Sequence, residues 1–159
     1  MKKITILVAT LLMMAIAAQA QGIQKLIDKY STDDRFTYVS VGSGLIELGM
    51  SFLGDKVEGF DKEMLSKFKG VRVLNFELET KTDEKIMNSL VDDITKALRT
   101  DPKAETLVET RDKGEITSIY FTSEGLLIVN KEKDEISVVF ILGEVTKKLM
   151  QDLVVKLKK

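Results

Sequence analysis

The stretch that decides the fold is residues 105–142, ETLVETRDKGEITSIYFTSEGLLIVNKEKDEISVVFIL. Apolar and β-branched residues alternate there in four strand-like runs, at residues 105–111, 115–121, 125–130 and 136–142. Short polar connections separate the runs, and such connections join antiparallel neighbours, because a parallel pair needs a crossover of about a dozen residues. The stretch therefore predicts a four-stranded antiparallel meander.

The longest predicted helix lies directly before the meander. Asp83 is its expected cap, and it ends at Thr100-Asp101-Pro102, since the residue before a proline is steered away from helical geometry. Its apolar stripe comprises Ile86, Met87, Leu90, Val91, Ile94, Ala97 and Leu98. A shorter helix with the same spacing is predicted from Ile23, Leu26, Ile27 and Tyr30.

The remaining segments complete the layout. Residues 36–41 and 71–78 read as strands, and residues 45–53 read as an apolar helix. Asp61 is expected to cap a short helix that buries Met64, Leu65 and Phe68 and stops at Gly70. A closing helix is expected from Leu149, Met150, Leu153, Val154 and Leu157. We therefore predict an α+β two-layer sandwich, with a largely antiparallel sheet of about six strands and helices on one face.

The first twenty residues have the three-part layout of a secretory signal peptide. Lys2 and Lys3 give a positive start, residues 4–18 form an almost unbroken apolar run, and Ala18-Gln19-Ala20 offers small residues to a signal peptidase. The apolar run is too short and wrongly flanked for a membrane anchor. We expect cleavage of residues 1–20 and a mature protein that begins at Gln21, in the periplasm or outside the cell. Because Gln21 is not cysteine, no lipid-linked membrane anchor is expected after cleavage.

Composition narrows the possible chemistry. Residues 21–159 have the length of one domain that can bury a core without staples. The chain contains no cysteine and no histidine, which excludes cysteine nucleophiles, Ser-His-acid arrangements and the imidazole ligands of most catalytic zinc sites. The formal net charge of −1 becomes about −3 when Lys2 and Lys3 are removed. Nucleic-acid binders carry a concentrated basic footprint instead, so no nucleic-acid partner is expected.

Gly42-Ser43-Gly44 comes nearest to a cofactor motif, since it lies between a predicted strand and a predicted helix. A dinucleotide fingerprint would need a third glycine where Glu47 stands, and a carboxylate there would repel phosphate. Ser43 has neither a histidine nor a Ser-x-x-Lys lysine to activate it. The loop acids Asp33, Asp34 and Asp61 do not form an EF-hand pattern. We therefore expect no cofactor, no bound metal and no catalytic residue of these kinds.

Paired carboxylates are the one enzymatic chemistry that the composition leaves open. Glu77 and Glu79 lie on the same face of a predicted strand, and Asp92-Asp93 lies on the polar side of the long helix. A glycosidase needs two carboxyl groups about 5 Å apart for retention, or about 6.5–9.5 Å apart for inversion. Solvated charge explains both pairs more simply, because exposed acids are the norm. A carboxylate-based glycan hydrolase is the alternative hypothesis.

The predicted helix at residues 45–53 is apolar on nearly every side, and such helices are usually buried. If one side stays uncovered, it forms a groove for a partner or ligand. Leu45, Leu48 and Phe52 are therefore the candidate interaction surface. Four methionines fall on predicted apolar helix faces and are expected to pack in the core: Met50, Met64, Met87 and Met150.

Several stretches together carry a family resemblance. They are the lead helix ending at Lys29-Tyr30, the strand at residues 37–41, residues 69–74 (KGVRVL), and the hairpins of residues 107–142 closed by Gly143 and a helix. This order resembles the secreted Bacteroidetes proteins called domain of unknown function 4252. The resemblance implies a secreted or envelope-attached α+β domain with no known reaction and no catalytic residues to transfer. Several members carry a lipoprotein cysteine after the signal peptide, from which Gln21 departs.

These observations favour a non-catalytic domain of the cell envelope that binds a protein or a small apolar ligand. Its support is the missing catalytic chemistry and the surplus apolar helix. The glycan hydrolase is the alternative from another class. An envelope-stress-associated structural factor is a third hypothesis, which the resemblance implies because genes of such proteins often lie near those of extracytoplasmic sigma factors. The sequence leaves the partner and the oligomeric state open.

Overall fold

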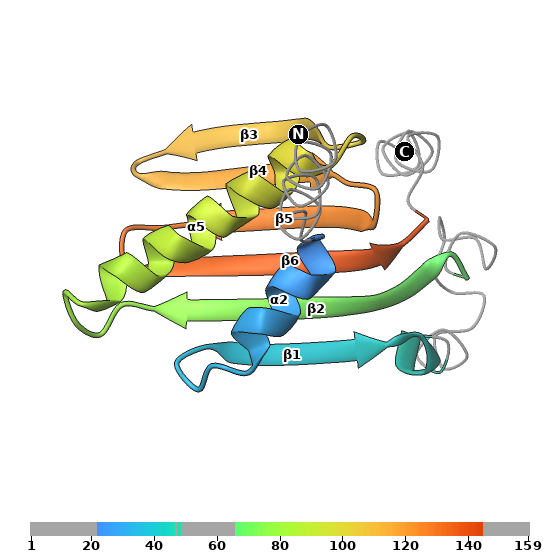
Figure 1. The fold of residues 1–159 in the computed structure, drawn as a ribbon, viewed down its shortest axis with the longest axis horizontal. Helices are drawn as coiled ribbons and strands as arrows, with labels where there is room; N and C mark the ends of the chain where they lie inside the picture. The colour runs from blue at the N-terminus through green and yellow to red at the C-terminus, as the bar shows by residue number, and fades with distance from the viewer. Residues whose placement is uncertain (1–21, 47, 49–65, 145–159) are drawn as a thin grey trace, which may run out of the picture.

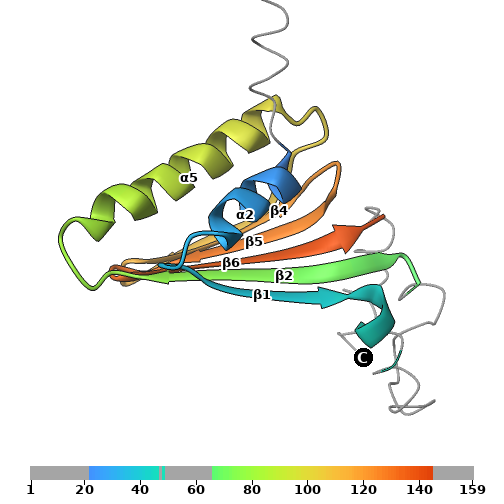
Figure 2. The same ribbon diagram turned by 60° about the horizontal axis from the view of Figure 1, so that its bottom comes forward.

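In the described part of the chain, six strands form one antiparallel sheet with helices on one face (Figures 1 and 2). The structure, a computed structural model, describes residues 22–46, 48 and 66–144. It confirms the predicted α+β sandwich. In chain order the elements are α2 (Ile23–Ser31), β1 (Thr37–Gly42), β2 (Phe68–Glu77), α5 (Asp83–Thr100), β3 (Glu105–Asp112), β4 (Glu115–Phe121), β5 (Gly125–Lys131) and β6 (Glu135–Gly143).

The sheet has the strand order β1-β2-β6-β5-β4-β3. The last four strands form the predicted meander, in which chain neighbours pair with one another. Its first turn has positive φ angles at Lys113 (46°) and Gly114 (92°). Two positive central residues are typical of a type I′ turn, whose twist matches that of paired strands. The strand pair β1–β2 joins the meander through β2 and β6, for example at Leu74 opposite Val138.

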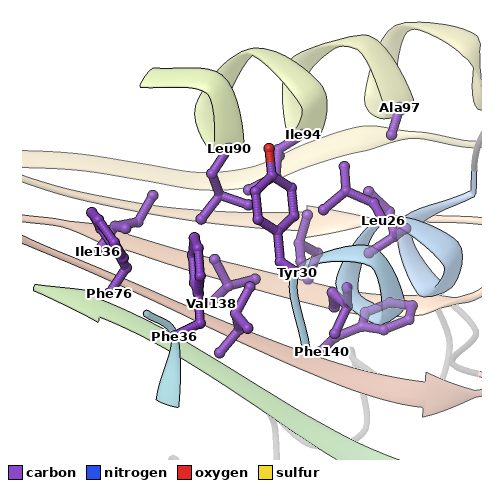
Figure 3. Packing of buried hydrophobic residues seen from close by; sticks show 14 of the residues in the cluster. Leu26, Tyr30, Phe36, Phe76, Leu90, Ile94, Ala97, Ile136, Val138 and Phe140 are labelled. Carbon is purple, nitrogen blue, oxygen red and sulfur yellow. The ribbon is translucent and has the colours of Figure 1, made fainter. Parts of the chain in front are cut away.

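Both α2 and α5 lie on the same face of the sheet, where they enclose the main core (Figures 2 and 3). The predicted stripes supply the helix side of this core, and alternate residues of the strands supply the sheet side. Its buried residues include Leu26, Ile27, Leu74, Leu90, Leu127, Ile136, Val138 and Phe140. Burial of these apolar side chains is the main force that holds the two layers together.

Helix α2 is tied to the sheet at both of its ends. At the start, the backbone N–H of Gln24 donates to Glu124 Oε2 at 2.9 Å, so an acid from the β4–β5 turn satisfies a free amide. Farther along, Asp28 pairs with Arg72 of β2. At the end, the ring of Tyr30 packs on Phe36, with centroids 5.1 Å apart. These contacts fix α2 across one face of the sheet.

Some local predictions are wrong. Phe68 and Gly70 lie in β2 and not in a helix that begins at Asp61, and residues 61–65 are outside the described part. Gly70 is buried opposite Gly42, and a Cβ there would come within 2.8 Å of the Val41 carbonyl oxygen. Its role is therefore close strand packing and not a helix stop. Asp83 begins α5, but its carboxylate accepts the N–H groups of Glu79 and Thr80 and not those of the helix.

Candidate interaction surface

The second face of the sheet is the one turned away from α2 and α5 (Figure 2). Its side chains form rows that cross the strands. Residues directly opposite one another in antiparallel strands share a row. The polar row consists of Thr37, Asn75, Ser137, Asn130, Thr117 and Thr110. The β-branched row consists of Val39, Val73, Val139, Ile128, Ile119 and Val108. The terminal row consists of Val41, Val71, Ile141, Leu126, Phe121 and Glu105.

The rows divide the second face into a polar part and an apolar part. In the polar row, Thr117 Oγ1 donates to Asn130 Oδ1 at 3.1 Å. Within the described residues, Asn75 Oδ1 is buried and accepts no hydrogen bond. The two apolar rows lie at the end of the sheet where β1 and β6 finish and β2 begins. That end can exclude water, whereas the polar row offers hydroxyl and amide groups.

The two edges of the sheet differ in their protection against strand pairing. Strand β3 carries Glu105, Glu109, Arg111 and Asp112, and its register shifts between Thr106 and Val108. Charges and bulges are the devices that keep edge strands from pairing with another chain. Strand β1 has the sequence TYVSVG, which contains no charge, and it pairs with β2 without a register shift. Within the described residues, edge β1 therefore lacks the charges and the bulge that protect edge β3.

The predicted surface residues follow directly after β1. Residues 43–46 and 48 are helical, and Leu45 and Leu48 are 62% and 53% exposed. Full burial, the usual state of such an apolar helix, is thus not found at these two positions. Phe52 lies outside the described residues. Val39, at the centre of β1, is 49% exposed, so exposed apolar side chains continue from the strand into the helical turn.

A separate cavity of about 500 Å³ brings together the predicted carboxylate pair. Glu77 and Glu79 line it together with Asp34, Asp83 and Arg35. The N–H of Thr80, the largest influence, and that of Glu79 hold the pKa of Asp83 below its usual range. Arg35 is engaged by Asp33, and its hydrogen bond lowers the pKa of Asp33 to about 2. Asp83 is therefore not suited to donate the proton that a general acid supplies.

The described residues also contain one perturbed polar cluster between the helices. Tyr30 Oη donates to Asp93 Oδ2 at 2.9 Å, and Lys29 Nζ donates to the same oxygen at 2.8 Å. Burial, followed by the bond to Asp93, raises the pKa of Tyr30 well above its usual value. Burial also opposes ionisation of Asp93, but the bonds from Lys29 and Tyr30 outweigh it and lower the pKa of Asp93. This cluster joins α2 to α5.

Gly42 and Gly44, the glycines nearest to a cofactor motif, lie at the end of β1 and in the helical turn that follows it. A Cβ on Gly42 or Gly44 would meet no atom within 4 Å, so neither glycine is needed for a close approach. Among residues 22–46, 48 and 66–144, no group of three or more acidic side chains is placed to hold a metal ion. No helix within these ranges has the length and apolar character required to cross a bilayer.

Sequence reasoning missed the cross-strand rows and the identity of the edge strands. Both depend on which distant strands pair, and β2 pairs with β6 across more than half of the described sequence. The alternation in each strand was a partial signal, because residues 71, 73 and 139 are all valines on one side of their strands. Only the register shows that these valines lie side by side.

Comparison with known proteins identifies a family to which the chain is similar. No curated protein and no solved structure matches the chain. The family described as Domain of unknown function (DUF4252) matches residues 30–153, which include β1, β2, α5 and the whole meander. The suggested resemblance is thereby confirmed, and the chain belongs to this family of domains of unknown function.

Proposed function

We propose that the protein is a non-catalytic binding domain of the cell envelope, which pairs an extended segment of a partner protein with edge strand β1. The difference between the two sheet edges carries this proposal. An unpaired edge presents a row of N–H and C=O groups that an extended peptide can join. The charged and bulged β3 opposes such pairing, whereas the uncharged β1 allows it.

The side chains around β1 indicate the chemistry of the partner segment. Val39 is half exposed on the second face, and Leu45 continues the apolar surface beyond the strand. A strand added to β1 would place alternate side chains beside Val39 and its row. The matching segment is therefore extended and uncharged, with β-branched or aromatic residues at every second position. Leu45, Leu48 and Phe52 remain the predicted extension of this surface.

Delivery to the envelope is part of the same proposal and has its own test. Its support is the signal-peptide layout of residues 1–20. Fractionation of the producing cells should place the protein outside the inner membrane, and N-terminal sequencing should begin at Gln21. Recovery of the uncleaved chain from the cytoplasm would contradict this location.

Site-specific crosslinking tests the binding surface, because Val39 and Val108 stand at opposite ends of the same row. A photo-crosslinking residue replaces Val39 in one variant and Val108 in the other, which are 49% and 43% exposed. We expect position 39 alone to capture a partner in native envelopes. Mass spectrometry of the crosslinked peptide should locate the contact in a segment with alternating apolar residues.

A synthetic peptide of that segment then allows a quantitative test with purified protein. Val39→Lys adds a charge to edge β1 and should weaken peptide binding by about tenfold. Val108→Lys is the matched control and should leave binding unchanged, provided that both variants keep the thermal transition of the parent. Equal capture at both positions, or equal binding by both variants, would refute strand addition at β1.

The glycan hydrolase is the second candidate, because the cavity does gather Glu77 and Glu79. Both residues are exposed, and Asp83 beside them is held in its charged form. Release of soluble products from isolated envelope glycans by the parent protein, and its loss in both Glu77→Gln and Glu79→Gln, would favour this hypothesis. An inactive parent protein would support the binding domain instead.

A further inference from the structure

The second face carries an apolar cluster of its own, which α2 and α5 do not cover. It is centred on Leu126, which is 8% exposed, and extends over β6, β5, β4 and β3 to the start of β2. Its partly buried members are Phe68, Leu107, Ile119, Phe121, Ile128 and Ile141. Such a contiguous apolar area on a sheet face calls for a covering element, because water contact with it is unfavourable.

The chain leaves the sheet at the same place. Gly143 ends β6 opposite Phe68, with φ at 143°, and the N–H of Glu144 donates to the Lys67 carbonyl oxygen at 3.2 Å. Residues 145–159 therefore start beside the cluster. Their sequence, VTKKLMQDLVVKLKK, repeats apolar residues at Val145, Leu149, Leu153 and Leu157. This spacing is typical of one face of a helix.

We propose that residues 145–159 dock on the second face as an amphipathic helix that runs from β6 across β5 and β4 to β3. The lengths agree: three strand spacings measure about 14 Å, and ten helical residues rise about 15 Å. The charges of the sheet and of the segment indicate that the helix runs from β6 toward β3 and not toward β1. The terminal row ends in Glu105 at β3 and in uncharged Val41 at β1, and the segment ends in Lys156, Lys158 and Lys159.

This docking covers one half of the second face and leaves β1 and β2 outside it. Leu149 would lie near β5, about 7 Å along the helix from Glu144, and Leu153 near β4 or β3, about 13 Å along. The inference does not depend on the proposed binding function, because it concerns contacts within one chain. An α-helix is about 10 Å wide, so it would cover the β-branched and terminal rows on β3 to β6 but not the polar row beside them.

Engineered cysteines test the docking in the full chain, which contains no cysteine of its own. The pairs Ile128→Cys with Leu149→Cys and Ile119→Cys with Leu153→Cys should form intramolecular disulfides under mild oxidation, since bonded cysteines need Cα atoms about 4.4–6.8 Å apart. The control pair is Val73→Cys with Leu153→Cys. Val73 lies in β2, on the side of β6 away from the proposed helix, so this pair should remain reduced. Equal bonding in the control, or bonding between chains only, would overturn the proposal in favour of another path or a second copy.

Thiol labelling provides a readout that does not require a disulfide. In a variant with Ile119→Cys alone, added Leu153→Asp should release the helix and raise the rate of maleimide labelling by about tenfold. Gln151→Asp, on the polar side of the same predicted helix, is the matched control and should leave the rate unchanged. An unchanged labelling rate with Leu153→Asp would show that residues 145–159 do not cover Ile119, and it would overturn the proposal.

Discussion

At the scale of single residues, Asp93 couples the two helices through one oxygen that accepts from Lys29 and Tyr30. Asp93→Asn should lower the free energy of unfolding by about 1 kcal/mol at neutral pH, a modest loss because the carboxylate is 26% exposed. The pKa of Asp93 is lowered in the folded state. Its contribution is therefore present above the ordinary aspartate pKa and is lost as the pH falls through the folded value.

Urea unfolding of the parent and Asp93→Asn from pH 7 to pH 2 measures this dependence. The difference in the free energy of unfolding between the two proteins should shrink as the pH falls toward 2. Asp92→Asn, an exposed neighbour, is the control and should follow the parent. A difference that stays constant down to pH 2 would show that charge on Asp93 contributes nothing.

Two glycines at opposite extremes of backbone strain provide a second residue-scale prediction. Gly125 has φ at 151°, and a Cβ there would come within 2.0 Å of the Ile141 carbonyl oxygen. Gly125→Ala should therefore cost about 3 kcal/mol or more, from an unfavourable φ together with a backbone contact. Gly42→Ala meets no atom within 4 Å and should be neutral or stabilising by about 0.5 kcal/mol. Thermal unfolding of both variants checks the contrast, and equal losses would contradict it.

At the scale of elements, the charges on β3 should act against association and not as a source of stability. Glu109 and Arg111 form an ion pair at 2.9 Å, with both side chains exposed, and such pairs contribute only about 0.2–1 kcal/mol. Replacing both with valine should leave the unfolding temperature nearly unchanged but make the protein associate as concentration rises. Light scattering over a concentration series measures this association. Ser89→Val, at an exposed position of α5, is the control. Association of the control alone would contradict the edge explanation.

The elements themselves could be read from the sequence where the local pattern was complete. The meander and α5 match their predicted bounds within one or two residues, because alternation and the 3.6-residue stripe are local and the turns carry polar residues or glycine. The start of β2 was missed because Phe68 and Gly70 take their conformation from pairing with β1 and β6. Tertiary pairing there overrides a helix-like spacing.

The candidate surface was only partly predictable for the same reason. The exposed positions Leu45 and Leu48 could be named because the run after Gly44 is apolar on nearly every side. The unprotected edge of β1 could not be named, since its outer position depends on β2 pairing with β6 far along the chain. The row that joins Val39 to Val108 exists only once all six strands are in register.

At the scale of the whole molecule, helix α2 completes the core by covering one face of the sheet. It supplies four buried side chains to the core, Ile23, Leu26, Ile27 and Tyr30. It also bridges distant parts of the sheet, since Gln24 bonds to Glu124 of the β4–β5 turn and Asp28 pairs with Arg72 of β2. The first described helix thus begins two residues after the predicted cleavage point, so cleavage at that point would leave the helix intact.

Two truncations follow from this arrangement. Residues 21–159 should unfold in one cooperative thermal transition, because no described core residue precedes Ile23. Residues 33–159 lack α2, which opens the core above Phe140 and Leu74. The four buried side chains of α2 contribute about 6–12 kcal/mol by burial, which is comparable to the whole stability of an ordinary domain, about 5–15 kcal/mol. The shorter chain should therefore lose its cooperative transition and bind a hydrophobic dye. A chain of residues 33–159 that melts as sharply as residues 21–159 would show that α2 is an accessory, and that the sheet and α5 form a sufficient core by themselves.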